Sequence, residues 1–295
     1  MGTAVFLAAG VMAFGAGCLA RSRYERDCLV TEEYRIVSEK IHGPEKTIVF
    51  LTDLHNKEFG DQNCRLLDAV RKVKPDAVLS GGDGMVAKKG NSDVEIPRKL
   101  LTELAKEFPV YCGNGNHESR MLWKSEIYGE AYENYRTALE NAGIRYLSNE
   151  AADLDSDIRI YGLDLPKSAY LPRSGEIPEG LLKETLGEPD PEKFCLLLAH
   201  SPLFFEEYAA WGADLTLSGH FHGGTIRLPV LGGVMTPQYQ FFYPRCAGYF
   251  ELPGKGREKS RMIVGRGLGT HSINIRLNDK PQVVVVRLCG ADTQQ

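Results

Sequence analysis

The sequence predicts an α/β protein in which two β-sheets are flanked by helices. Short runs rich in Val, Ile, Leu and Phe, such as 46–53, alternate with segments whose apolar residues recur at helical spacing. The apolar runs have the length and composition of buried strands, and the second half of the chain is the richer in them. This alternation is typical of layered α/β architecture.

The first half of the chain alternates between strands and helices. The segment 46–53 is rich in β-branched and aromatic residues, as buried strands are. Leucine and valine residues recur at helical spacing over 61–76, and Pro75 marks the end of that helix. The other elements expected here are strands over 77–83 and 109–114 and helices over 96–108 and 125–143.

The second half is dominated by apolar runs of strand length. Between them, residues 166–193 are rich in Pro, Gly and charged residues and predict a surface insertion. The expected strands are 157–165, 194–201, 213–220, 225–230, 261–265 and 282–288.

The first twenty residues differ from the rest because they contain no charged side chain. Arg21, Arg23 and Arg26 come directly after them. Twenty such residues in a helix are about long enough to cross a bilayer, so we expect an N-terminal transmembrane anchor over 1–20. A cleaved, exported form is the alternative. The positive-inside rule then favours a cytoplasmic location for the rest of the chain, which comprises a linker and first strand over 21–45 and a domain over 46–290.

The charge balance argues against nucleic acid as a partner. Lys and Arg number 35 against 39 Asp and Glu, giving a formal net charge of −4 and no global basic field. The seven cysteines are scattered singly without a CxxC pair, which argues against a zinc ribbon and against a disulfide framework. A phosphate-bearing ligand would therefore be held by local groups or by metal ions.

Polar residues come directly after several expected strands. In layered α/β folds, ligand sites lie beyond the carboxyl ends of the strands. Five of the seven histidines fall at such ends. The residues concerned are Asp53 and His55 after the first strand, Asp83 after the second, Asn116 and His117 after the third, His200 after a later strand, and His220 and His222 after the next.

This combination of side chains predicts a two-metal hydrolase. Imidazole, carboxylate and amide ligands suit divalent manganese, iron, zinc or nickel, whereas the absence of thiolates argues against a structural zinc site. Two such ions about 4 Å apart can share a carboxylate and a hydroxide and can clamp the attacking and leaving oxygens of a phosphoryl transfer. Single residues of these types are commonly helix caps or hydrogen-bonded core groups, so the prediction depends on their occurring together.

The order of the motifs resembles the signature of the calcineurin-like metallophosphoesterases. The blocks are "DLH" (53–55), "GGD" (81–83), "GNHE" (115–118), a lone histidine at 200 and "GHFHGG" (219–224), and the resemblance covers about 46–288. The spacer "KPDAVLSGGD" and the ending "GRGLGTHSINIRLNDKPQVVVVRL" are similar to the membrane-associated bacterial phosphodiesterase branch. The family implies two metal ions and a four-layer αββα sandwich of two mixed sheets flanked by helices, the metallo-dependent phosphatase fold. Gly84 departs from the family, which often has a non-glycine residue there.

The resemblance also implies a role for each strand-end residue. His117 would contact the substrate phosphate as an acid or electrostatic stabiliser. The implied metal ligands are Asp53, His55 and His222 for the first ion, Asn116, His200 and His220 for the second, and Asp83 as the bridge.

The expected activity is hydrolysis of a phosphodiester or pyrophosphate. With a membrane anchor, a lipid-linked substrate is one candidate and a soluble nucleotide diester the other. Two alternatives of different kinds stay open, which are a phosphomonoesterase or protein phosphatase with the same metal site, and a metal-bound scaffold without catalysis.

Three further features have two readings each. The aromatic segment 236–245 is either a lip beside the active site or a loop packed on the core. Arg276 either reaches a phosphate or is an exposed arginine on a terminal strand, and Asp164 either lines the site or belongs to a turn. Trp123 and Trp211 are most simply packing residues.

Overall fold

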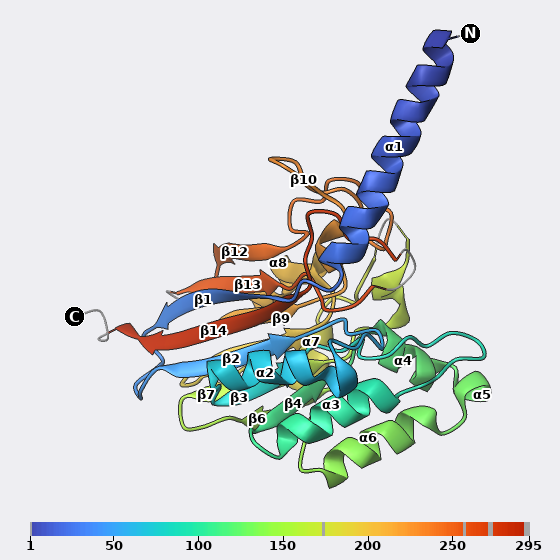
Figure 1. Ribbon diagram of the computed structural model, residues 1–295. Coiled ribbons are helices and arrows are strands. Elements are labelled where there is room, and N and C mark those ends of the chain that lie inside the picture. The colour runs from blue at the N-terminus through green and yellow to red at the C-terminus, as the bar shows by residue number, and fades with distance from the viewer. Residues whose placement is uncertain (1, 173–174, 256–257, 271–273, 292–295) are drawn as a thin grey trace.

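Two six-stranded mixed sheets form the centre of the protein (Figure 1). The computed structural model describes residues 2–172, 175–255, 258–270 and 274–291. The first sheet has the order β1 (Val30–Ser38), β14 (Gln282–Gly290), β2 (Lys46–Leu51), β3 (Ala77–Ser80), β4 (Val110–Gly113) and β5 (Arg145–Leu147). The second has the order β12 (Gly248–Pro253), β13 (Lys259–Val264), β9 (Leu215–Ser218), β8 (Phe194–Ala199), β7 (Ile158–Leu163) and β6 (Glu150–Asp153).

Strand alternation explains how the sheets stack. In β2, Ile48 and Phe50 belong to the core between the sheets, whereas Val49 and Leu51 face the helices on the outer side. Leu196, Leu198, Leu215 and Leu217 reach the same central core from the second sheet. The central strands are covered on both faces, which is why β2 and β8 read as continuous apolar runs, whereas the edge strands β1 and β12 alternate.

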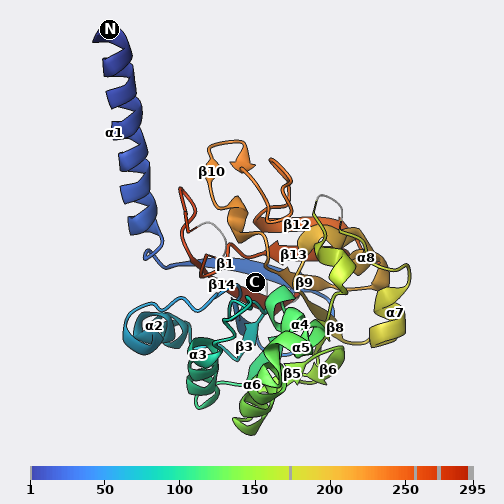
Figure 2. The ribbon, with the colours of Figure 1, turned by 90° about the vertical axis from the view of Figure 1, so that its right-hand side faces the viewer.

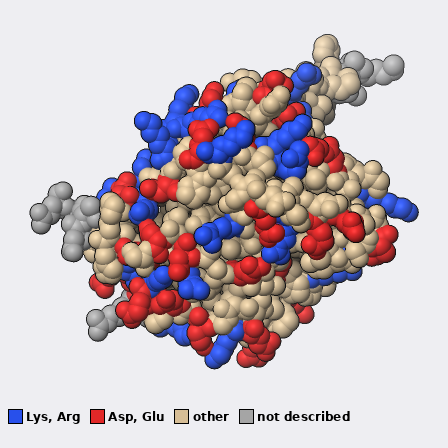
Figure 3. Space-filling model, turned by 90° about the horizontal axis from the view of Figure 1, so that it is seen from below, with Lys and Arg blue, Asp and Glu red and all other residues tan. Residues whose placement is uncertain are grey.

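Helices cover the outer face of each sheet and complete four layers. The first sheet is covered by α2 (Cys64–Val73), α3 (Glu95–Ala105) and α6 (Ala131–Asn141), and the second by α7 (Leu181–Leu186) and α8 (Phe205–Trp211). Figure 2 shows these layers from the side. The arrangement confirms the predicted αββα sandwich. On the face shown in Figure 3, basic and acidic side chains are interspersed.

Several element boundaries differ from the sequence prediction. The helix expected over 125–143 is interrupted, because α5 (Ser125–Tyr128) ends at Gly129, whose φ of 57° is left-handed. The strand expected over 225–230 is only β10 (Arg227–Leu228), paired with β11 (Gly232–Gly233) in a short hairpin. The insertion over 166–193 contains α7 and a 3₁₀ turn over Lys167–Tyr170, and it contributes Ala169 and Leu182 to the core.

The N-terminal segment forms one helix, α1 (Gly2–Glu25), that projects away from the domain in both ribbon views (Figures 1 and 2). It extends past residue 20 into the expected linker and ends on the domain, where Ser22 and Glu25 are buried. Within the described residues no helix is both long and apolar enough to cross a membrane, and the anchor expected over 1–20 stays a prediction.

Candidate active site

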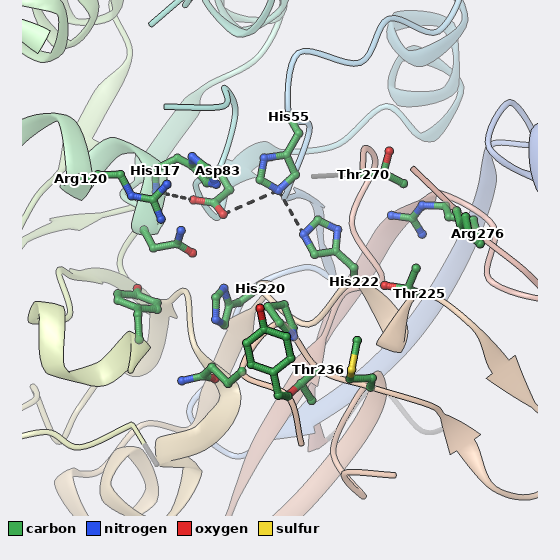
Figure 4. Close-up of a pocket in the computed structure, with 17 residues that line it drawn as sticks. His55, Asp83, His117, Arg120, His220, His222, Thr225, Thr236, Thr270 and Arg276 are labelled. Atoms are coloured by element: carbon green, nitrogen blue, oxygen red, sulfur yellow. Dashed lines mark hydrogen bonds and ion pairs between the residues drawn. The ribbon is translucent and has the colours of Figure 1, made fainter. Parts of the chain in front are cut away.

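The structure brings all eight strand-end residues together at one end of the sheets, and Figure 4 shows five of them labelled, His55, Asp83, His117, His220 and His222. The first sheet contributes residues that come after β2, β3 and β4, and the second contributes residues that come after β8 and β9. Each of the eight is at most 9% exposed. Six of them line a pocket of about 300 Å³, and the side chains of Asp53 and His200 are fully buried beside them. We call Asp53, His55, Asp83, Asn116, His117, His200, His220 and His222 the pocket floor.

The donor atoms of the floor form three overlapping groups, in each of which they lie within 4.8 Å of one another. The imidazole Nε2 of His200 lies 3.2 Å from Asp83 Oδ2, and that of His222 lies 3.5 Å from Asp53 Oδ1. The side-chain oxygen of Asn116 is buried without a hydrogen-bond partner among the described residues. The groups are Asp53 with His55 and His222, Asp83 with His200 and His220, and His55 with Asp83 and His117.

Backbone carbonyls fix the orientation of three imidazoles. The Nδ1 atoms of His55, His200 and His222 face the carbonyl oxygens of Met85, Gly81 and Gly269 at 3.3, 2.8 and 3.3 Å. A neutral ring that donates from Nδ1 directs its Nε2 lone pair into the floor, as metal-binding histidines do. The Nε2 atoms of His55 and His222 are only 3.1 Å apart, so two lone pairs then face each other. A cation between such groups would relieve their repulsion, and the donor set fits a divalent metal.

His117 is oriented the other way. Its Nδ1 accepts a hydrogen bond from the backbone N–H of Ala87 at 2.8 Å, so the neutral ring carries its proton on Nε2. His117 lies in the first turn of α4 (Asn116–Trp123), a helix that sequence reasoning did not predict. A donor at this position suits a proton transfer or a hydrogen bond to a phosphate better than it suits metal ligation.

Charges of both signs are concentrated in the floor and shift one another's pKa. Burial lowers the pKa of His200, but the carboxylates of Asp83 and Asp53 outweigh burial and raise it to about 10. A metal ion that binds the Nε2 atom of this ring would therefore displace a proton from it. Burial raises the pKa of Asp53 to about 6, against the attraction of His200. The pKa of Asp83 is well below its usual range, because its histidine neighbours overcome the effect of burial. Ionisable groups whose pKa values are shifted this far by burial and by neighbouring charges are typical of functional sites.

Backbone strain is concentrated at the same residues. Asp53, His55, Asp83, His220 and His222 all have positive φ, between 47° and 67°. This conformation is uncommon for residues other than glycine and costs of order 1–3 kcal/mol each. Its recurrence at five floor residues indicates that the fold holds these side chains in place at a cost in stability, as functional sites do.

Glycines allow the loops of the floor to pack closely. A Cβ at Gly115 would lie 2.3 Å from Asp83 Oδ1, and one at Gly219 would lie 2.4 Å from Asp53 Oδ2. Gly84 is explained in the same way, because a Cβ there would lie 2.9 Å from the Pro97 side chain on α3. The departure from the family pattern therefore reflects local packing between this loop and α3.

Glu118 is a functional residue that sequence reasoning missed. Its buried carboxylate accepts hydrogen bonds from the backbone N–H groups of Asp83, Gly84 and Gly115, at 2.8, 2.9 and 3.0 Å. Burial, together with the charge of Asp83, raises its pKa to about 7. Glu118 thus ties the loop that carries Asp83 to the start of α4. The signal was its place directly after His117 in "GNHE".

The other residues that line the pocket form its upper part. We call this part the pocket rim, and it consists of Arg120, Tyr170, Thr225, residues 235–239, Thr270, Ile275 and Arg276. Near it, Phe241 and Phe242 are 66% and 46% exposed, so they do not close the loop on the core, whereas Tyr243 packs edge-to-face on Phe221. Asp164 does not line the pocket, and its carboxylate accepts a hydrogen bond from Asn114.

Trp123 and Arg276 differ from their expected environments, whereas Trp211 does not. Trp211 is buried and packs against Tyr161, as expected. Trp123 is 36% exposed at the end of α4, near Tyr170 of the rim. Arg276 is only 1% exposed, so the expectation of an exposed arginine is wrong.

The sequence matches the profile of calcineurin-like phosphoesterases over residues 46–224. It is 29% identical to an uncharacterised metallophosphoesterase of Aquifex aeolicus, covering 92% of this chain and 96% of that protein. It is 27% identical to phosphodiesterase YaeI of Escherichia coli, covering 86% of each chain. The UDP-2,3-diacylglucosamine pyrophosphatase LpxG of Chlamydia trachomatis is 27% identical over 50% of this chain and 43% of its own length.

The matched segment includes every floor residue, from Asp53 to His222. It also spans more than half of the chain. The protein therefore belongs to the calcineurin-like phosphoesterase family and is a metal-dependent phosphoester hydrolase.

Proposed function

We propose that the protein is a phosphodiesterase whose pocket floor holds two divalent metal ions. The observation that carries this proposal is the orientation of His55, His200 and His222. The Nδ1 atom of each ring faces a backbone carbonyl oxygen, so its Nε2 atom points toward Asp53 and Asp83. We assign Asp53, His55 and His222 to one ion, Asn116, His200 and His220 to the other, and Asp83 to both.

The floor residues would divide the chemistry between them. When bound, two such ions supply Lewis acidity to a phosphoryl group and a nucleophile at neutral pH. Asp83 contributes negative charge between the two ligand sets, as its position within 3.7 Å of both His55 and His200 suggests. His117 would donate a proton or hydrogen bond from Nε2 to the phosphate or to the leaving oxygen.

The pocket has space for an organic group attached to the phosphate, because it continues from the floor to the rim residues Tyr170, Thr236 and Tyr239. The relative named as a phosphodiesterase, at 27% identity, supports a phosphodiester as the substrate class. A phosphomonoesterase with the same metals is the competing function.

An assay on two nitrophenyl esters separates these functions. With added manganese, we expect faster release of nitrophenol from the bis-nitrophenyl diester than from the monoester. Faster hydrolysis of the monoester would assign the competing function. Metal binding without hydrolysis of either ester would indicate a scaffold.

We further propose that the substrate is linked to a lipid and that α1 brings the domain to a lipid surface. Phe6, Val11 and Phe14 of α1 are each about 70–80% exposed, and the helix has no charge before Arg21. A diacylglucosamine pyrophosphatase among the relatives supports a lipid-linked diphosphate as substrate. Flotation of the full chain with phospholipid vesicles tests this, with a Phe6→Ser, Phe14→Ser variant expected to stay at the bottom. Equal flotation of both proteins would contradict the role of α1.

A further inference from the structure

A buried arginine connects the pocket to the base of α1. Arg276 is among the largest fully buried side chains of the described residues and borders the pocket on the side of His222 (Figure 4). Its guanidinium donates to the backbone carbonyls of Arg266, Gly267 and Gly269 at 2.8, 3.1 and 2.7 Å. All three carbonyls belong to the turn 266–269 that comes after β13.

This turn touches the pocket floor at two points. The backbone N–H of Gly269 donates to the carbonyl of Asp53 at 2.6 Å. The carbonyl of Gly269 faces Nδ1 of His222 at 3.3 Å and accepts from Arg276 as well. The guanidinium thus fixes the same carbonyl oxygen that orients the His222 ring.

Asp279 makes a second contact with the segment that carries His222. It is fully buried and pairs with Arg276 at 3.2 Å. A Cβ at Gly223, the residue after His222, would lie 2.2 Å from Asp279 Oδ1, so the carboxylate lies directly against this backbone. Gly223 also has φ of 61°, which other residues rarely adopt.

The last turn of α1 contacts the segment 276–279, which carries Arg276 and Asp279. The backbone N–H of Arg276 donates to Ser22 Oγ at 3.0 Å, and that of Asp279 donates to Glu25 Oε2 at 3.4 Å. Glu25 is 1% exposed and is held by Arg21 at 2.7 Å. Hydrogen bonds therefore run continuously from the base of α1 to the ring of His222.

We propose that Arg276 and Asp279 are positioning residues for the metal centre, acting on His222 through the Gly269 carbonyl and the Gly223 backbone, and that the last turn of α1 holds them in place. This inference rests on the proposed ligand role of His222. Partners that orient metal-binding histidines typically contribute about 10–100-fold to metal affinity or activity. Since the contacts reach Asp53 and His222, we expect the effect at their metal site and not at that of His200 and His220.

The test is a cobalt(II) titration of the metal-stripped full chain, monitored by the visible absorption of the bound ion. His222→Ala and His200→Ala variants assign the spectrum of each site. In Arg276→Lys, the lysine keeps the positive charge opposite Asp279 but cannot bond three carbonyls together. We expect cobalt affinity at the His222 site to fall about 10–100-fold with an altered spectrum, and affinity at the His200 site to stay within about twofold. The kcat for the nitrophenyl diester should fall while KM changes little.

A control and a second variant keep the test decisive. Arg245→Lys alters an arginine that pairs with Glu206 and does not line the pocket, and it should change neither cobalt site. Circular dichroism shows whether Arg276→Lys folds. If it does not, the double variant Ser22→Ala, Glu25→Gln replaces it, because this variant weakens the contacts between α1 and the segment 276–279. We then expect a smaller loss of cobalt affinity at the His222 site.

Three results are distinguishable. A folded variant with both cobalt affinities unchanged, or with equal loss at both sites, would overturn the positioning role. Selective loss at the His222 site would support it. A wild-type chain that shows no histidine-bound cobalt would contradict the proposed metal ligands themselves.

Discussion

The floor and the rim of the pocket are built in opposite ways. Floor residues come directly after strands of both sheets, are at most 9% exposed and in five cases have a strained backbone. Apart from Arg120 on α4 and Tyr170 in a 3₁₀ turn, rim residues come from loops, and aromatic side chains beside them, such as Phe241, are largely exposed. The floor is therefore suited to fixed chemistry and the rim to adaptable contact with a substrate. We expect changes in the floor to abolish turnover. Changes in the rim should alter substrate preference, except at Arg276, to which we assign a positioning role.

The largest effect is expected from Asp83→Asn. The substitution removes the charge that we assign to both ions, and each ion contributes several kcal/mol to the transition state, so turnover should fall by at least about 10⁴-fold. Elemental analysis of the purified variant should show fewer than two metals per chain. Two bound metals together with near-normal turnover would contradict the assignment of Asp83 as a ligand of both ions.

His117→Ala should separate catalysis from metal binding. The ring donates from Nε2 and is not assigned to a metal, so turnover of the diester should fall by about 10²–10⁴-fold while metal content stays near that of the wild type. The measurement pairs steady-state kinetics with elemental analysis. A loss in turnover below about threefold would mean that His117 takes no part in the reaction.

Glu118→Gln tests whether Glu118 stabilises the backbone of the pocket floor, and not whether it takes part in catalysis. The amide offers one acceptor oxygen where the carboxylate accepts three backbone N–H bonds, so buried donors lose their partners. The free energy of unfolding should fall by about 2–4 kcal/mol, measured in urea at pH 8. The exposed Glu126→Gln on α5 is the matched control, with a change within about 0.5 kcal/mol. Equal stability of the two variants would contradict the role of Glu118.

The smallest effect is expected at the rim. Phe241→Ser with Phe242→Ser removes exposed aromatic surface without touching the floor. A small nitrophenyl diester should be hydrolysed within about twofold of the wild-type rate, whereas turnover of a lipid-linked diester should fall about 5–20-fold because the lipid loses apolar contact. Tyr249→Ser, on β12 away from the pocket, serves as the control. Equal losses on both substrates, or none, would argue for a soluble substrate.

The floor could be located from sequence because each of its residues comes directly after an apolar strand. Asp53 after β2 and His220 after β9 lie far apart in the chain, yet the ends of strands meet at one edge of stacked sheets. The alternation of strands and helices predicted two sheets flanked by helices, and the family resemblance implied the four layers. Local pattern was thus sufficient to locate the floor.

The parts that were missed depend on contacts between distant segments. An exposed arginine was one of the two readings of Arg276, because nothing near it in sequence reveals the turn 266–269 or the base of α1 around it. Glu118 was quoted in a motif, but its role depends on three N–H groups, two of them in a loop more than thirty residues away. The positive φ of Asp53 and His222 likewise results from packing, which residue type does not report.

The most direct test of a dinuclear centre is a metal titration of the stripped full chain with manganese while diester hydrolysis is monitored. Two ligand sets that share Asp83 predict negligible activity without metal and full activity only as the second ion per chain is bound. Activity that persists in the stripped chain, or that is complete at one ion per chain, would contradict a dinuclear centre built on the pocket floor.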